Sequence, residues 1–288
     1  MRPVEQPGDL RELVGDWRRD GGSLGFVPTM GNLHQGHLDL VERARSLADR
    51  VVVSIFVNPT QFGENEDLST YPRTPEEDRR ALSALGVDCL FTPAAAQMYP
   101  LGLPARCLVQ LPGISDVLCG ASRPGHFTGV ATVVAKLLNL VAPDVAVFGE
   151  KDFQQLIVIR RMVAELFLPV RIEGVPTRRE PDGLAMSSRN RYLDAGERER
   201  APALYRTLAA LRDAVGGGRR DYAALEREGA GRLERAGFRV DYLAVRRAAD
   251  LAPPEAGDSQ LVILGAAWMG PARLIDNVRV CAAPTAQD

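Results

Sequence analysis

The sequence predicts an α/β protein, in which a mostly parallel sheet with helices on both faces is followed by a smaller α+β domain with an antiparallel sheet. Two observations predict this class. Over the first 176 residues, short apolar runs alternate with helical segments, as in a sheet covered on both faces. The later chain has two helical segments and then three apolar runs with no helix between them. We therefore expect two domains, residues 1–176 and 177–288, with the boundary near Pro176.

The strands expected in the first domain are continuous apolar runs, which is typical of strands buried on both faces. They cover residues 24–27, 51–57, 87–91, 145–148 and 170–175. Helices are expected over residues 37–50, 129–141 and 152–166, and from Pro75 onward. At the Pro75 helix, Thr74 and Glu77 predict a capping box, with proline at the first helical position.

The second domain begins with two helices, expected over residues 194–215 and 221–236 and separated by the three glycines at 216–218. The apolar runs that follow are interpreted as strands over residues 238–245, 261–268 and 273–280. Proline and glycine pairs between these runs mark turns, so the three strands are expected to form an antiparallel sheet.

Composition excludes several classes of protein. The chain has 288 residues, of which 45% are hydrophobic and 25% charged, a balance that excludes disordered, collagen-like and coiled-coil chains. The net charge of −2 offers no basic excess for nucleic acid. The apolar region 130–148 is interrupted by polar residues and proline, and the N-terminus has no secretory h-region. Four scattered cysteines favour a reducing compartment and no zinc cluster. We expect a cytoplasmic protein with no membrane segment.

Two histidines follow the first strand in the segment PTMGNLHQGH. His34 and His37 are three residues apart, so they share a face at a helix start. Gly31 and Gly36 allow a ligand to approach the backbone closely, and N–H groups at a helix N-terminus attract anions. The segment is interpreted as a phosphate site with two imidazole donors. A metal pair is the alternative, although no third ligand is evident, and a surface or core histidine is the ordinary role of this residue type.

Two further segments carry groups suited to phosphate. In FGEKDFQQ, Gly149 permits close approach and Lys151 supplies a positive charge, while Asp152 either caps a helix or binds an amine or metal. Gln155 lies one turn further on and can face the same crevice. In LAMSSRNR, the Ser187 and Ser188 hydroxyls and the adjacent arginine suit phosphate oxygens, and the segment's position suggests a flexible lid.

Two loops are less specific. The loop after the second strand carries Asn58, Gln61 and Tyr71, and its uncharged amides suit the hydroxyl and carboxylate groups of a small polar substrate. The segment GASRPGHFTGV carries Arg123 and His126, whose roles are left open. Both loops are equally compatible with ordinary solvated structure.

In order along the chain, the motifs PTMGNLHQGH, FVNPTQF, YPRT, RPGHF, FGEKDFQQL and MSSRN closely resemble those of the pantoate–β-alanine ligase family. The resemblance runs from about residue 1 to about residue 280. The first and last motifs are also similar to the HIGH and KMSKS signatures of a wider nucleotidyl-transferring superfamily. The resemblance implies a Rossmann-like domain binding nucleotide and pantoate, a C-terminal lid domain, a homodimer and a requirement for Mg²⁺, with no protein ligand of the metal named. It also implies ATP-dependent condensation of pantoate with β-alanine through a pantoyl adenylate.

The resemblance assigns roles residue by residue. The implied catalytic residues are His37 as proton donor, His34 and Lys151. The implied ATP-binding residues are Met30, Gly31, His34, His37, Gly149, Glu150, Lys151, Asp152, Arg178, Met186, Ser187, Ser188 and Arg189. The implied pantoate-binding residues are Gln61, Gln155, Asn58 and Met30, and those for β-alanine are Gln61 and Tyr71.

Two other functions remain open at this point. A nucleotidyltransferase acting on a phosphorylated alcohol would share His34, Gly36 and His37, but would call for arginine or lysine in place of the amides Gln61 and Gln155. A nucleotide-binding module without catalysis would bind ATP without turnover. An aminoacyl-tRNA synthetase is disfavoured, because no basic surface or tRNA-binding domain is apparent.

Overall fold

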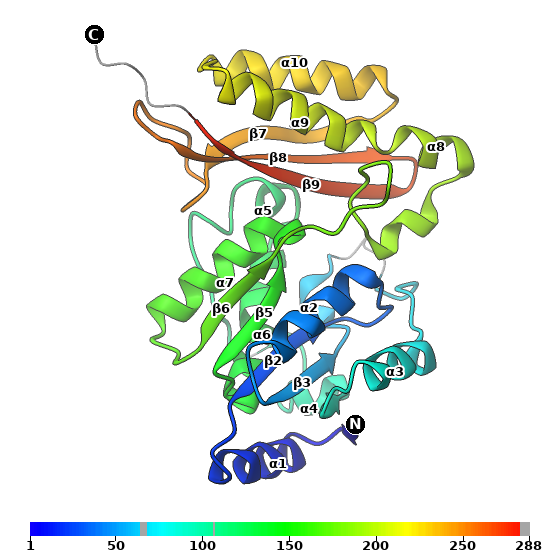
Figure 1. Cartoon of the computed structure of the whole chain (residues 1–288), viewed down its shortest axis with the longest axis vertical. Coiled ribbons are helices and arrows are strands. Elements are labelled where there is room, and N and C mark those ends of the chain that lie inside the picture. Colours follow the sequence, from blue (N-terminus) through cyan, green and yellow to red (C-terminus); the bar gives the residue numbers. More distant parts are fainter. Residues whose placement is uncertain (64–67, 106, 283–288) are drawn as a thin grey trace. The chain divides into compact units, whose positions relative to one another are not determined.

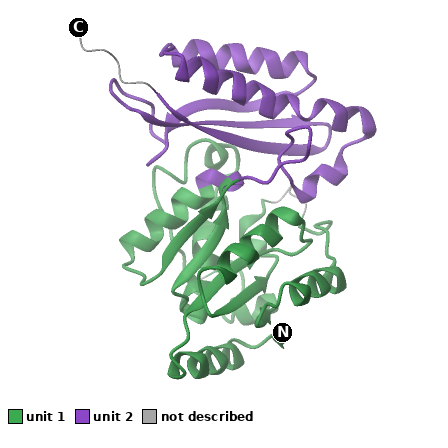
Figure 2. Ribbon diagram, in the orientation of Figure 1, with its two compact units in different colours: residues 1–150, 155–176 green, residues 151–154, 177–288 purple. Residues whose placement is uncertain are grey.

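The computed structural model describes residues 1–63, 68–105 and 107–282 (Figure 1). The chain divides into two compact units (Figure 2). The first unit comprises residues 1–150 and 155–176, and the second comprises residues 151–154 and 177–288. The contacts of the short segment 151–154 thus assign it to the second unit, whereas the residues directly before and after it belong to the first unit.

The first unit is built on a six-stranded sheet in the order β1-β4-β3-β2-β5-β6, and every neighbouring pair in it is parallel. The strands are β1 (Arg2–Val4), β2 (Leu24–Thr29), β3 (Arg50–Ile55), β4 (Cys89–Phe91), β5 (Val145–Gly149) and β6 (Arg171–Val175). The predicted parallel sheet is confirmed. The edge strand β1 was not predicted, because three residues carry too little pattern to be recognised.

The strand order reverses at β2. The chain proceeds from β2 to β3 and β4 on one side, and later places β5 and β6 on the other. β2 and β5 are paired directly through Gly25 with Val145 and Phe26 with Ala146. In open α/β sheets, ligands bind beyond the carboxyl ends of strands at this kind of reversal. The loops that follow β2 and β5 therefore begin at the position where such a fold binds its ligand.

Helices cover both faces of this sheet. They are α1 (Pro7–Arg19), α2 (Gln35–Arg45), α3 (Pro75–Ala84), α4 (Ala95–Met98), α5 (Cys119–Ser122), α6 (His126–Val141) and α7 (Phe153–Glu165). Val27, Val53 and Val147 form one core cluster with apolar residues of α2. Successive strand residues point to opposite faces, so Phe26 and Val52, both fully buried, face the other side. α6 contacts β2 and α1, and the apolar residues all round it are buried, as expected of a helix in a core.

The start of α3 differs from the prediction. Proline does occupy the first helical position, but the Thr74 side chain accepts no capping hydrogen bond from a described backbone N–H. Its hydroxyl donates instead to Asp78 Oδ1 at 3.0 Å. The predicted capping box with Glu77 is wrong, because the buried carboxylate of Asp78, one turn into the helix, takes the hydroxyl.

The second unit contains a three-stranded antiparallel sheet, β7 (Arg239–Arg247), β8 (Gln260–Met269) and β9 (Ala272–Cys281). Its helices are α8 (Ala195–Arg200), α9 (Ala203–Gly216) and α10 (Tyr222–Arg235). Figure 1 shows α9 and α10 on one face of this sheet, and apolar residues from the helices and strands form one core cluster there. The predicted antiparallel sheet is confirmed.

The predicted single helix over 194–215 is wrong, because the structure has two helices there. α8 begins after a capping box between Asp194 and Glu197, and it ends at Arg200. α9 begins after Pro202, which is its N-cap residue. Proline has no N–H for a helical hydrogen bond and restricts the residue before it, so the helix is interrupted at this point.

Candidate active site

The loop between β2 and α2 has a backbone that only certain residues can adopt. Gly31 has φ +80° and Asn32 has φ +52°. A Cβ on Gly31 would lie 2.9 Å from Ile55 Cγ2 in the next strand. Glycine is therefore required at this position, both by the left-handed conformation and by the close approach of β3.

A buried carboxylate holds this loop. Asp78 of α3 accepts hydrogen bonds from the backbone N–H of Asn32 and of Leu33, each at 2.8 Å. Only 3% of Asp78 is exposed. These two N–H groups are therefore satisfied within the protein. Asp78 could not be recognised from the sequence as a residue of the site, because an acidic residue in a first helical turn usually lies on the surface.

The structure brings His34 and His37 together. His34 is the N-cap residue of α2, and the two ring centroids are 4.1 Å apart. The backbone N–H of His34 donates to His37 Nδ1 at 3.3 Å. An accepting Nδ1 carries no proton, so the neutral His37 ring carries its proton on Nε2 and donates from that atom.

Three of the four residues assigned to pantoate also contact one another. Gln61 Nε2 donates to Met30 Sδ at 2.9 Å, and Asn58 Nδ2 lies 3.1 Å from Gln61 Oε1. Asn58 is buried, and its Oδ1 accepts from the Tyr99 hydroxyl at 2.6 Å. The two amides therefore lie after the carboxyl end of β3, and Gln61 contacts Met30, which directly follows β2. The fourth residue, Gln155, lies in the first turn of α7 and is half-buried.

Arg123 and His126, whose roles the sequence left open, hold the main chain of Gln61. His126 Nδ1 lies 2.8 Å from the Gln61 carbonyl oxygen, and Arg123 Nη2 lies 3.4 Å from the same atom. A carbonyl only accepts, so Nδ1 of His126 is the donor and Nε2 accepts from Arg123 Nη1 at 3.1 Å. The two residues position the short helix η1 (Pro59–Gln61) that carries Gln61.

Tyr71 is buried, with 6% of its surface exposed. Its ring meets the Phe62 ring edge-on, with centroids 5.8 Å apart. The main chain around Tyr71 is held by Arg73, whose guanidinium donates to the Tyr71 carbonyl at 3.3 Å. Tyr71 therefore contributes to packing after η1 as well as carrying a phenol group.

Within the second unit, Lys151 and Ser187 line the same small recess. Its other lining residues are Leu184, Ala185, Asn190, Leu204, Leu274, Ile275 and Asp276. Ser187 Oγ accepts from the Arg189 N–H at 3.3 Å and so caps the short helix η3 (Ser188–Tyr192). Met186 is tied to the preceding strand-like segment by its N–H, which donates to the Arg178 carbonyl at 2.9 Å.

The remaining residues assigned to ATP lie near the end of β5. Gly149 is the last residue of that strand and pairs with Val175. Glu150, Lys151 and Asp152 form the short helix η2. The Lys151 ammonium lies 4.0 Å from the Asp152 carboxylate, which is 47% exposed.

Two kinds of feature are absent from the part of the chain that the structure describes. No group of three or more histidine, cysteine, aspartate or glutamate side chains lies close enough together to hold a metal ion. No described helix is long and apolar enough to cross a membrane.

Comparison with known proteins gives a consistent result. The model of the pantoate-beta-alanine ligase family matches residues 2–279. Pantothenate synthetase of Methylococcus capsulatus is 57% identical over 280 residues, which cover 97% of this chain and 98% of that protein. The corresponding protein of Pseudomonas aeruginosa is 55% identical, covering 97% of this chain and 99% of its own.

Solved structures agree with the sequence matches. Pantothenate synthetase from Thermus thermophilus superposes with a TM-score of 0.88 at 48% identity, covering 96% of this chain and 99% of that one. Pantoate-beta-alanine ligase from Francisella tularensis, in a complex described as containing beta-gamma ATP and beta-alanine, gives a TM-score of 0.81 at 34% identity, covering 96% and 97%.

Proposed function

Because this chain belongs to the pantoate-beta-alanine ligase family and is a ligase that forms pantothenate, we propose that it condenses (R)-pantoate with β-alanine in two steps that consume one ATP. In the first step, the pantoate carboxylate attacks the α-phosphorus of ATP, and pyrophosphate leaves. In the second step, the β-alanine amine attacks the acyl carbon of pantoyl adenylate. AMP leaves as the amide bond forms, and the amine loses a proton.

His37 and His34 act on the first step in this proposal. Negative charge develops on the α-phosphate oxygens during attack, and preorganised donors stabilise such charge. His37 suits this role because its Nδ1 is occupied by the His34 N–H, which leaves Nε2 as the proton-bearing atom. This hydrogen bond is the observation on which the proposed role of His37 rests.

Pantoate is proposed to bind at Met30, Asn58, Gln61 and Gln155. Amide groups suit the hydroxyls and carboxylate of pantoate, and the Met30 side chain offers an apolar surface for its methyl groups. The mutual contacts of Met30, Asn58 and Gln61 support this assignment, because an ordered set of side chains loses less entropy on binding. β-Alanine is proposed to bind at Gln61 and Tyr71.

Two groups of residues are proposed to bind ATP. Lys151, Ser187, Ser188 and Arg189 supply charge and donors for the triphosphate, and the shared recess of Lys151 and Ser187 supports this part. The other proposed contacts are Met30, Gly31, His34, His37, Gly149, Glu150, Asp152, Arg178 and Met186. In this proposal, residues 1–176 are the nucleotide- and pantoate-binding domain, and residues 177–288 are the lid domain.

Mg²⁺ is proposed as a companion of ATP rather than as a separately bound metal. In nucleotide-dependent enzymes this ion usually keeps several waters and is held by substrate phosphates with one or two carboxylates. The exposed carboxylate of Asp152 is the proposed protein contact. When bound, the ion neutralises phosphate charge. We also propose that the protein is a homodimer and that it is located in the cytoplasm.

The test is to incubate the protein with ATP, pantoate and β-alanine and to measure AMP and pantothenate. We expect AMP formation to require pantoate; AMP formed at the same rate without pantoate would contradict the function.

His37→Ala should lower the rate about 10²–10³-fold. Glu42→Ala, at an exposed position on the same helix, is the matched control and should leave the rate unchanged. Gln155→Ala should raise the KM for pantoate far more than that for ATP.

A further inference from the structure

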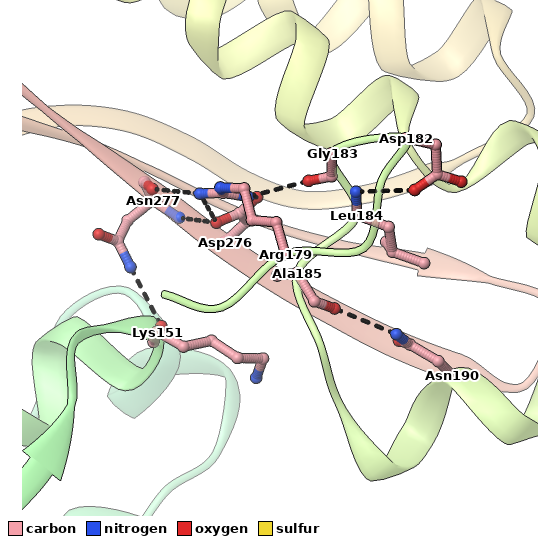
Figure 3. Close-up of polar contacts among 9 residues, drawn as sticks. All are labelled: Lys151, Arg179, Asp182, Gly183, Leu184, Ala185, Asn190, Asp276 and Asn277. Carbon is pink, nitrogen blue, oxygen red and sulfur yellow. Dashed lines mark hydrogen bonds and ion pairs between the residues drawn. The ribbon is translucent and has the colours of Figure 1, made fainter. Parts of the chain in front are cut away.

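We propose that Arg179, Asp276 and Asn277 are positioning residues that fasten Lys151 and the Ser187 loop to strand β9 (Figure 3). The inference rests on the proposed function, in which Lys151 and Ser187 bind the phosphates of ATP. It adds three residues to which neither the sequence motifs nor the proposed function gives a role.

Asn277 holds the main chain of Lys151. Its Nδ2 donates to the Lys151 carbonyl oxygen at 3.1 Å, and only 7% of Asn277 is exposed. Two residues further along β9, the Arg279 guanidinium lies over the Phe153 ring, 5.2 Å from its centroid. Figure 3 shows the Lys151 side chain extending away from this anchor. The main chain from which the Lys151 side chain extends is therefore held by β9.

Asp276 orders Asn277. Oδ1 of Asp276 accepts from the Asn277 N–H at 2.7 Å and from Arg179 Nη2 at 3.0 Å, while Oδ2 accepts from Arg179 Nη1 at 2.6 Å. The Asp276 side chain is 2% exposed, and that of Arg179 is 20% exposed. Burial raises the pKa of the Asp276 carboxyl, and the guanidinium of Arg179 opposes that rise. The pair has bidentate geometry, which fixes both partners in direction as well as in distance.

Arg179 connects this pair to the loop that carries Ser187. Its guanidinium also donates to the Gly183 carbonyl at 3.1 Å and to the Asn277 carbonyl at 3.3 Å, and it lies 3.8 Å from the centroid of the Tyr205 ring. Arg179 itself forms a β-bridge with Ala185. The loop is thereby closed two residues before Ser187.

Asn190 continues the same set of bonds. Its Nδ2 donates to the Ala185 carbonyl at 3.1 Å, which ties the far side of the Ser187 segment back to the bridge. Lys151, Ser187, Asn190 and Asp276 all line the same recess. One buried ion pair thus fixes both segments that supply phosphate-binding groups.

Stability alone does not account for this arrangement. Replacing a buried ion pair with apolar residues of similar volume is often neutral or stabilising, because two charges are costly to remove from water. The value of the pair lies in its geometry. Precise placement matters for a group that must meet a phosphate, because small displacements of positioning groups cost much of the rate.

Asn277→Ala is the primary variant, because it removes the hydrogen bond to the Lys151 carbonyl and leaves the ion pair in place. We expect the KM for ATP in pantoate-dependent ATP–pyrophosphate exchange to rise about five-fold, the effect of losing one hydrogen bond. The KM for pantoate should not change. Asp276→Asn should have a larger effect on the KM for ATP, and Asp241→Asn is its matched control. Asp241 forms an ion pair with Arg273 at 2.6 Å on the same sheet.

A second measurement does not depend on turnover. Lys136 and Lys151 are the only lysines in the sequence. Modification with an amine reagent, read by mass spectrometry, should be blocked by ATP at Lys151. In Asn277→Ala, half-protection of Lys151 should need about five times more ATP. Lys136, which donates to the Met98 carbonyl at 2.7 Å, should react equally in both proteins and serves as the internal control.

The two measurements separate the possible failures. If Asn277→Ala lowers only the melting temperature and leaves the KM and the Lys151 protection unchanged, the positioning role is wrong. If the unaltered protein shows ATP protection of Lys151 but no pantoate-dependent exchange, the proposed function is wrong, and the protection shift still decides the positioning role. If ATP does not protect Lys151 in the unaltered protein, the proposed ATP contact of Lys151 is wrong, and so is the positioning role that rests on it.

Discussion

Two buried aspartates hold the two loops that carry much of the proposed chemistry. Asp78 accepts the N–H groups of Asn32 and Leu33 ahead of His34, and Asp276 accepts the N–H of Asn277 and the guanidinium of Arg179. In each case, a carboxylate fixes backbone that would otherwise be free to move. A residue that supports a site in this way is found only when its burial is known, whereas His37 and Lys151 are found from their places after strands.

The buried thiol of Cys89 gives a pH-dependent prediction at this scale. Burial in β4 raises the pKa of Cys89 from its ordinary value of 9.0 to about 12. The thiolate is the reactive form, so at pH 8 about one molecule in 10⁴ carries it, against about one in ten for an unshifted thiol. We expect a small alkylating reagent to leave Cys89 unmodified from pH 7 to 10, as measured by mass spectrometry of its peptide.

The control for this experiment is the protein unfolded in guanidinium, where Cys89 should react readily. In the folded protein, the exposed Cys107 and Cys281 should react well before the buried residues. Alkylation of Cys89 at pH 8 at the rate of the unfolded chain would show that the burial of this strand is wrong.

Among the elements, the packing of α6 against η1 depends on one glycine. A Cβ on Gly129 would lie 2.2 Å from the Thr60 carbonyl oxygen and 2.8 Å from the Gln61 nitrogen. Asn58 Nδ2 donates to the Gly129 carbonyl at 3.2 Å across the same contact. The close approach of this helix therefore helps to place the amides assigned to pantoate.

Gly129→Ala should lower the free energy of unfolding by about 1–3 kcal/mol, because the added methyl group overpacks the contact. It should also raise the KM for pantoate, because η1 must shift. Gly15→Ala is the matched control: it lies inside α1, and its Cβ would meet only the end of the flexible Arg19 side chain, at 3.6 Å. In Gly15→Ala, the free energy of unfolding measured by chemical denaturation should rise by about 0.5–1 kcal/mol. Equal effects at the two sites would contradict the packing described for α6.

At the level of elements, the sequence was most informative where the chain has long periodic or apolar segments. Strands β2, β3 and β5 and helix α6 could be predicted because burial on all sides leaves a continuous apolar run. β1, α4 and α5 could not, because three or four residues carry no period. Pro202 is itself a signal for a helix break, but the helical pattern on both sides of it predicts one continuous helix. The contacts of Asp276 could not be predicted, because they join residues about 100 positions apart.

Across the whole molecule, each unit has its own core. The core of the second unit includes Leu211 of α9 and Ile263 of β8, whereas that of the first includes Val53 and Val147. Compact units with separate cores can open separately. The change from alternating to clustered elements along the sequence predicts two domains, residues 1–176 and 177–288. The membership of residues 151–154 in the second unit followed from contacts that no local pattern displays.

Leu211→Ala should therefore destabilise the second unit selectively, by about 2–5 kcal/mol, because it opens a cavity at a residue that is 1% exposed. Hydrogen exchange should accelerate at the amides of β8 and remain unchanged at those of β2 and β3. Leu101→Ala, at a side chain that is 76% exposed, should change neither region. Acceleration of equal size in both sheets would mean that the chain opens as a single cooperative unit.

The pairing of β2 with β5 has a consequence for synthesis on the ribosome. About 115 residues separate the end of β2 from the start of β5, so the central seam of the sheet closes only after that length has been made. At a translation rate of roughly 5–20 residues per second, the edge of β2 that pairs with β5 stays unpaired for about 6–23 s. During that interval the nascent chain exposes an apolar strand edge, a template for wrong pairing. Chaperone demand for this protein should accordingly be greatest midway through translation rather than at its end.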